Sequence, residues 1–133
     1  YLANEQFYLV DLPGYGFVSG GVGLRSILGK IVGRYISDRQ ELRAVLQLID
    51  ARHGPTELDL QMIEWLQEAQ KPFLLVFTKA DKLSRNKLKT QFDRLDSQKS
   101  LAGISFVSFS AVDGRGKDDI WGWIDDALAG KAV

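Results

Sequence analysis

The chain has 133 residues, of which 45% are hydrophobic and 26% are charged, and its 17 basic side chains balance 17 acidic ones. This length suits one domain with a sizeable core, and the apolar fraction is too high for an intrinsically disordered chain. There is no cysteine and one histidine, which excludes disulfides, iron–sulfur clusters, thiolate zinc sites and multi-histidine metal sites.

Charge, apolar runs and the N-terminal sequence together indicate which partners and which location to expect. A formal net charge of zero argues against a globally basic nucleic-acid binder, so no DNA partner is expected. No apolar run approaches the roughly 18–20 residues needed to cross a bilayer, so no membrane partner is expected. Without a secretory signal, a cytoplasmic location is expected. Because the chain starts at Tyr1 and enters a strand-like run almost at once, we expect an interior segment of a longer protein.

Four short apolar runs predict β-strands, and they lie at residues 7–10, 44–49, 73–77 and 104–109. The first three runs are nearly continuous, which is typical of strands covered on both faces of a parallel sheet. The fourth alternates, with Ile104 and Phe106 on one side, which is typical of an edge strand.

Helical patterns separate these runs. A helix is predicted over residues 24–37, and Thr56 followed by Asp59 resembles a capping box that starts another. A charged helix begins near Ser84. The last helix has the clearest stripe, with apolar residues at Ile120, Trp123, Ile124, Ala127 and Leu128. Strands that alternate with helices predict a parallel sheet with right-handed crossovers, in one α/β domain or part of one.

Each predicted strand ends in a polar or glycine-containing cluster, at residues 11–16, 50–54, 78–81 and 110–114. In open α/β sheets the ligand lies beyond the carboxyl ends of the strands. Four clusters at four such ends therefore predict one shared crevice. Within the second cluster, His53 precedes a helix, where fixing a loop is a commoner role than catalysis.

The cluster that begins at Asp11 suits a bound phosphate. A carboxylate that leaves a buried strand can hold a water on Mg²⁺, and the absence of a Cβ at Gly14 lets a backbone N–H approach a phosphate. An ordinary strand-ending turn uses Asp, Pro and Gly as well. The hexapeptide alone leaves both interpretations open.

The T-K-A-D sequence at residues 78–81 suits a guanine base. The Asp81 carboxylate can accept from N1–H and from the N2 amino group, a pair of donors that adenine lacks. The methylene stem of Lys79 can lie along the base. Small residues at Ser110 and Ala111 let a backbone N–H approach a carbonyl such as guanine O6. The alternative for T-K-A-D is a charged loop that opens a surface helix.

Together these sequences resemble a known family. D-x-P-G, T-K-x-D and S-A, in this order and each after a strand, resemble the third, fourth and fifth nucleotide-binding motifs of the P-loop GTPases. More narrowly, D-L-P-G-Y-G-F at residues 11–17 and L-I-D-A-R-H-G-P-T at residues 48–56 resemble the EngB family of bacterial ribosome-assembly GTPases. The similarity covers nearly the whole chain.

The resemblance implies a Ras-like P-loop NTPase fold, a three-layer α/β/α arrangement with a mostly parallel sheet that lacks its N-terminal strands. Residues 1–133 would form a partial EngB-type GTP-binding domain, from the second switch region to the C-terminal helix. The implied cofactors are GTP or GDP and Mg²⁺. The implied partner is a precursor of the large ribosomal subunit or its rRNA, and the implied role is subunit assembly, with normal cell division and septation depending on it.

The resemblance also implies roles for individual residues. Asp11 would hold Mg²⁺ through water, and Gly14 would meet the γ-phosphate. Lys79 and Asp81 would clamp the guanine, and the Ala111 N–H would contact its O6. No catalytic residue is assigned. The implied nucleotide-binding residues are Asp11, Leu12, Pro13, Gly14, Thr78, Lys79, Ala80, Asp81, Phe109, Ser110 and Ala111.

Two of the chain's departures from the family pattern bear on phosphate binding and hydrolysis. The chain contains no GxxxxGKS/T loop and no first-switch threonine, and both are expected upstream of Tyr1. Many GTPases orient the attacking water with a glutamine where this chain has Tyr15, so slow intrinsic hydrolysis is expected.

The missing loop bears on the sheet. The strand that feeds the phosphate loop would lie between the strands at 7–10 and 44–49, and its loss would leave backbone groups unpaired at about 1–3 kcal/mol each. Three alternatives stay open: the strand lies outside these residues, the two strands pair directly, or another chain fills the gap. We expect the segment alone to be unstable and to bind nucleotide feebly.

Two other functional interpretations remain. One is a degenerate GTPase-like adaptor that does not hydrolyse nucleotide, and the other is an unrelated flavodoxin-like domain. Residues 82–99 carry six basic and two acidic side chains. This stretch suits contact with ribosomal RNA phosphates, and a solvated helix face explains it equally well.

Overall fold

The structure is a computed structural model that describes residues 1–12, 14 and 21–133. The described chain forms two compact units, Tyr1–Arg39 and Gln40–Val133. Within the described residues, no helix has both the length and the apolar character that crossing a bilayer requires.

The first unit contains a short hairpin and a long helix. Strand β1 (Leu2–Ala3) pairs antiparallel with β2 (Phe7–Tyr8), and helix α1 spans Gly21–Asp38. The helix confirms the one predicted at 24–37 and begins three residues earlier. The hairpin closes through a tight turn, in which the Gln6 N–H donates to the Ala3 carbonyl at 2.9 Å.

This hairpin corrects the prediction for residues 7–10. We expected a buried strand of the parallel sheet, but Phe7–Tyr8 pairs antiparallel with Leu2–Ala3, and Tyr8 is 75% exposed. The tight turn brings the nearest upstream residues alongside, which a run of apolar residues cannot indicate. The direct pairing of the first two predicted strands is also not found, because the described residues form separate sheets, β1-β2 and β3-β4-β5.

The second unit contains the parallel sheet. Strands β3 (Val45–Asp50), β4 (Phe73–Thr78) and β5 (Phe106–Ser108) are all parallel, in the order β3-β4-β5. The predicted parallel pairing of these three strands is confirmed, and β5 lies at an edge as its alternating pattern predicts. Asp50 is the register partner of Thr78, so these two strands end side by side.

Two helices of this unit, α2 (Glu57–Glu68) and α3 (Arg85–Ser97), begin where the sequence predicts, and the last, α4 (Lys117–Leu128), contains the predicted apolar stripe. The capping box is present: the Asp59 N–H donates to Thr56 Oγ1 at 3.2 Å, and the Thr56 N–H donates to Asp59 Oδ2 at 2.8 Å. Two short 3-10 helices follow β4 and α3, η1 at Ala80–Lys82 and η2 at Lys99–Leu101.

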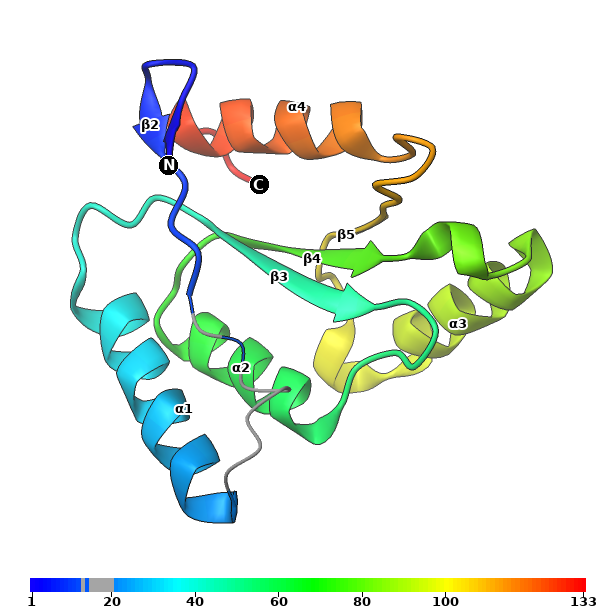
Figure 1. The fold of residues 1–133 in the computed structure, drawn as a ribbon, viewed down its shortest axis with the longest axis horizontal. Helices are drawn as coiled ribbons and strands as arrows, with labels where there is room; N and C mark the ends of the chain where they lie inside the picture. Colours follow the sequence, from blue (N-terminus) through cyan, green and yellow to red (C-terminus); the bar gives the residue numbers. More distant parts are fainter. Residues whose placement is uncertain (13, 15–20) are drawn as a thin grey trace. The chain divides into compact units, whose positions relative to one another are not determined.

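The second unit has three layers, with α2 and α3 on one face of the sheet and α4 on the other (Figure 1). Phe77 lies at the centre of the α2–α3 side, in edge contact with Phe92 and Phe106. On the other face, α4 buries Ile124 and Ala127. The buried cluster on the α2–α3 side consists of Ile49, Ala51, Ile63, Leu75, Phe77, Leu95 and Leu101.

Candidate functional site

The ends of β3 and β4 are joined by hydrogen bonds. The Thr78 hydroxyl donates to the Ile49 carbonyl at 3.3 Å, and the Ala51 N–H donates to the Thr78 carbonyl at 2.9 Å. Directly after Thr78, Lys79 adopts a left-handed backbone conformation with φ of 58°. This conformation turns the chain sharply from β4 into η1, so that residues 78–81 form a compact loop.

Asp50 is the centre of an ion-pair cluster at this edge. Arg52 donates to its two carboxylate oxygens, from Nε to Oδ1 at 3.0 Å and from Nη2 to Oδ2 at 2.7 Å. Lys79 Nζ lies 3.1 Å from the same Oδ2. The guanidinium of Arg52 holds the pKa of Asp50 well below its usual range against the opposing effect of burial, and Lys79 contributes to the same shift. The Asp50 carboxylate is therefore charged and tethers Lys79.

Sequence reasoning placed Asp50 in a strand-end cluster but gave it no role. The signal that could have found it is the parallel register, which sets Asp50 beside Thr78 and so next to Lys79. His53 is exposed, and its backbone N–H donates to the Asp50 carbonyl at 3.2 Å. This contact is made by the backbone, so the loop-fixing role of the His53 side chain stays a prediction.

Asp81 is oriented by a buried serine. The Ser110 hydroxyl, which is fully buried, donates to Asp81 Oδ1 at 2.8 Å. The same Oγ accepts from the Val112 N–H at 3.1 Å and from the Asp113 N–H at 3.3 Å. Oδ2 of Asp81 lies 3.9 Å from the exposed ammonium of Lys82. The hydrogen bond from Ser110 thus fixes one oxygen of the carboxylate. The Asp81 side chain remains 17% exposed.

The loop that carries Asp81 is also tied to the loop after β5 through backbone groups. The Ala80 N–H donates to the Phe109 carbonyl at 3.1 Å, and the Phe109 N–H donates to the Phe77 carbonyl at 2.8 Å. Ala80 is fully buried, whereas Ala111 is exposed. The exposed residue Ala111 thus directly follows Ser110, the residue that orients Asp81.

Three of the four predicted clusters, at residues 50–54, 78–81 and 110–114, are joined in the second unit by the Lys79–Asp50 and Ser110–Asp81 contacts. The fourth belongs to the first unit, where Asp11 and Gly14 are exposed and Leu12 is half-buried. A Cβ added at Gly14 would meet no atom within 4 Å. Pro13 and Tyr15 lie outside the described residues.

The donors and acceptors of this edge suit a guanine base. The carboxylate of Asp81 matches two adjacent N–H donors, and a backbone N–H of the exposed residue Ala111 would match a carbonyl oxygen. Mg²⁺ is usually held by one or two carboxylates together with water and substrate phosphates, so the single exposed Asp11 fits an ion that arrives with a nucleotide. Within the described part of the chain, no three acidic or histidine side chains gather into a metal cluster.

Known proteins share sequence with most of this chain. A family model described as 50S ribosome-binding GTPase matches residues 1–79. A probable GTP-binding protein EngB of Limosilactobacillus reuteri (strain DSM 20016) is 37% identical over 129 residues, which cover 96% of this chain and 66% of that protein. A protein of the same description from Levilactobacillus brevis is 39% identical, over 94% of this chain and 64% of the relative. The chain thus spans slightly less than two thirds of these relatives.

Two solved structures share the fold. A crystal structure of a probable GTP-binding protein engB aligns with a TM-score of 0.75 and 16% identity, over 91% of this chain and 76% of that one. The translation elongation factor SelB of Methanococcus maripaludis in its apo form aligns with a TM-score of 0.68 and 22% identity, over 93% of this chain and 25% of that one. At such identities the likeness concerns the fold, and the expected α/β architecture is confirmed.

Proposed function

Since this chain belongs to the EngB family, we propose that it forms the guanine-recognition part of a GTP-binding switch protein. Family membership rules out the flavodoxin-like alternative. The activity of the whole protein, its nucleotide and its partners are proposals, because the chain spans only part of its relatives.

The hydrogen bond from Ser110 to Asp81 carries this proposal. It orients a charged carboxylate at the mouth of the loop, so that its two oxygens can accept from guanine N1–H and the N2 amino group. Adenine offers this carboxylate no pair of donors, so binding adenine would leave a partly buried charge unpaired. The resulting loss of binding free energy is larger than that from losing one ordinary hydrogen bond. Guanine recognition therefore rests on the fixed direction of this one side chain.

Other residues would assist. The stem of Lys79, tethered by Asp50, would pack along the base, and the Ala111 N–H would meet O6. Thr78, Ala80 and Phe109 would shape the loops rather than touch the base. When bound, Mg²⁺ would offset the charge of the phosphates. Asp11 would hold it through water, with Leu12, Pro13 and Gly14 near the γ-phosphate.

We further propose that the phosphates are held mainly by sequence outside these 133 residues, because the chain contains no GxxxxGKS/T loop. Hydrolysis would be slow without an activator, since Tyr15 occupies the place of a water-orienting glutamine. The description of the matching family supports a precursor of the large ribosomal subunit, or its rRNA, as the partner that uses the switch. Roles in subunit assembly, cell division and septation, and a cytoplasmic location, belong to the same proposal.

Competition binding tests the proposal. A fluorescent guanine nucleotide is bound to the protein extended at its N-terminus to the length of its relatives, and GDP or ADP is added as competitor. We expect GDP to compete at least about 100-fold better than ADP, from two lost charge-assisted hydrogen bonds. Equal competition by GDP and ADP would overturn guanine recognition.

The external phosphate site has its own test. The present chain alone is expected to bind guanine nucleotide far more weakly than the extended protein, and equal affinity of the two proteins would refute the external phosphate site. Guanine binding without hydrolysis, even with ribosomal precursors present, would favour the adaptor.

A further inference from the structure

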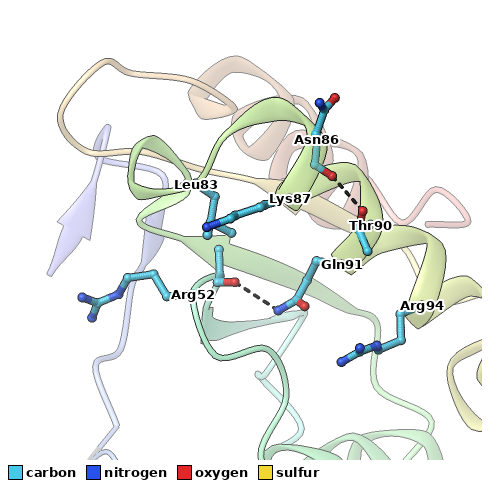
Figure 2. Close-up of a pocket in the computed structure, with 8 residues that line it drawn as sticks. Arg52, Leu83, Asn86, Lys87, Thr90, Gln91 and Arg94 are labelled. Atoms are coloured by element: carbon cyan, nitrogen blue, oxygen red, sulfur yellow. Dashed lines mark hydrogen bonds between the residues drawn. The ribbon is translucent and has the colours of Figure 1, made fainter.

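A second candidate surface lies between the chain after β3 and the helix α3 (Figure 2). It borders the guanine loop, because its lining includes Leu83, directly after η1, and Arg52, which pairs with Asp50. It is an open groove with a volume of about 330 Å³. Its polar lining comes mainly from α3. The side chains that matter here are Arg52, Asn86, Lys87, Thr90, Gln91 and Arg94.

The charge of this groove is of one sign. Arg52, Lys87 and Arg94 line it, and no acidic residue does. Arg52 is already paired with Asp50, but within the described part of the chain neither Lys87 nor Arg94 pairs with a carboxylate. The helix also carries an ion pair between Lys89 and Asp93, at 2.8 Å, and neither of those residues lines the groove. Two of the three unpaired cations described on α3, Lys87 and Arg94, thus line the groove, whereas the third, Arg85, does not.

The wall of the groove is fixed by the loop after β3. Gln91 Nε2 donates to the Ala51 carbonyl at 3.1 Å, a bond that Figure 2 shows between the loop and the helix. Gly54 is buried with φ of +69°, and a Cβ added there would lie 2.6 Å from Gln91 Nε2. The glycine therefore allows the close approach that pins Gln91. The loop and α3 present one preformed surface.

We propose that this groove binds the sugar–phosphate backbone of an RNA strand. Lys87 and Arg94 are seven residues apart on α3, about 10.5 Å along the helix axis, which suits several phosphates of a polyanion better than a single anion. The Asn86 amide supplies further N–H donors for phosphate oxygens, whereas the Thr90 hydroxyl, which donates to the Asn86 carbonyl at 2.9 Å, can still accept from a ribose hydroxyl. No aromatic residue lines the groove, so base stacking is not part of the contact.

This inference rests on the proposed action on a ribosomal precursor, and it names the surface that would touch RNA. The binding is expected to be independent of sequence and strongly dependent on salt, since phosphate contacts carry no base information and release counterions.

The test compares two double variants of the N-terminally extended protein. Lys87→Gln with Arg94→Gln removes two charges from the groove, and Lys99→Gln with Lys117→Gln removes two exposed charges elsewhere. A labelled RNA hairpin of mixed sequence is titrated at several salt concentrations. We expect the groove variant to bind RNA about fivefold to 20-fold more weakly, and its slope of log K against log salt to be shallower by roughly 1.4 to 1.8. The control variant should change affinity less than twofold.

Equal losses in the two variants would overturn the proposal, because they would reflect net charge alone. Poly-glutamate is added as a second competitor. If it displaces the labelled hairpin as effectively as unlabelled RNA does, the proposal is also overturned, and an acidic protein becomes the better candidate for the partner of the groove. Guanine-nucleotide affinity is measured for the same proteins and should stay at the parent value, which also shows that they are folded. If the parent protein shows no preference for guanine, the proposed function is wrong. The RNA comparison between the two variants would still test whether the groove binds RNA.

Discussion

The hydroxyl of Ser110 donates a 2.8 Å hydrogen bond to Oδ1 of Asp81, across two loops that are far apart in sequence. The serine is fully buried and also accepts two backbone N–H groups of its own loop. Its position is therefore fixed on three sides. Because Ser110 is fixed, its hydrogen bond holds the Asp81 carboxylate in one orientation. Asp81 therefore acts as a specific hydrogen-bond acceptor rather than as a mobile surface charge.

Replacing Ser110 with alanine tests this relationship. Ser110→Ala removes the donor to Asp81 and leaves the Val112 and Asp113 N–H groups without their acceptor. We expect the free energy of unfolding to fall by about 1–3 kcal/mol, the usual cost of unsatisfied buried groups. The preference for GDP over ADP should fall as well. Urea unfolding and nucleotide competition measure the two effects.

Ser105→Ala is the matched control, because Ser105 is an exposed serine just before β5. It should change stability by less than about 0.5 kcal/mol, as is usual for surface substitutions. If Ser110→Ala retains the parent's guanine preference while the fold is intact, Ser110 does not orient Asp81 for the base.

Gly116 supports the same loop from its far end. It has φ of +78°, and a Cβ added there would overlap the Ser108 carbonyl oxygen. Gly116→Ala therefore combines an unfavourable left-handed backbone with a clash against β5 that a flexible side chain cannot relieve. We expect a loss of at least about 2–4 kcal/mol in the free energy of unfolding, measured in denaturant.

Gly114 separates the two costs. It has a similar φ of +76°, but a Cβ there would meet no atom within 4 Å. Gly114→Ala should therefore cost only about 1 kcal/mol, the penalty of the left-handed conformation. Equal destabilisation by the two substitutions would contradict the close approach at Gly116.

Asp50 links stability to pH. Its pKa is lower in the folded chain than in the unfolded one because Arg52, and then Lys79, bind the charged form. Its stabilising contribution is therefore fully present above the unfolded value near 4 and is lost as the pH falls through the folded value. Asp50→Asn should be less stable than the parent at pH 7, and the difference should shrink below about pH 4.

The same substitution frees Lys79, so we expect guanine-nucleotide affinity to fall about twofold to fivefold, the range for a partly exposed ion pair. Asp96→Asn serves as the control, since it removes an exposed carboxylate from α3. A stability difference between Asp50→Asn and the parent that is constant from pH 7 to pH 2 would contradict the assigned role.

Much of the second unit was predictable because its signals are local. The capping box at Thr56 and the apolar runs of β3, β4 and β5 need no knowledge of distant residues. Asp81 and Ser110 were also predictable as separate motifs at strand ends. Their direct hydrogen bond was not, because it depends on how closely two crossovers bring their loops together.

The remaining features depend on tertiary neighbours. Residues 7–10 have the composition of a buried strand, yet Phe7–Tyr8 pairs with Leu2–Ala3 in an exposed hairpin. A run of apolar residues does not indicate which other segment of the chain will pair with it. The tether between Asp50 and Lys79 and the tight packing at Gly116 depend in the same way on register and crossover geometry.

The most direct test of the central claim is the base preference of Asp81→Asn in the N-terminally extended protein. Xanthine carries a carbonyl where guanine carries the N2 amino group, and a carboxamide can donate to that carbonyl while it accepts from N1–H. We predict that the variant loses at least about 100-fold in affinity for GDP and prefers xanthosine diphosphate. A variant that still chooses GDP over xanthosine diphosphate as strongly as the parent would contradict the account.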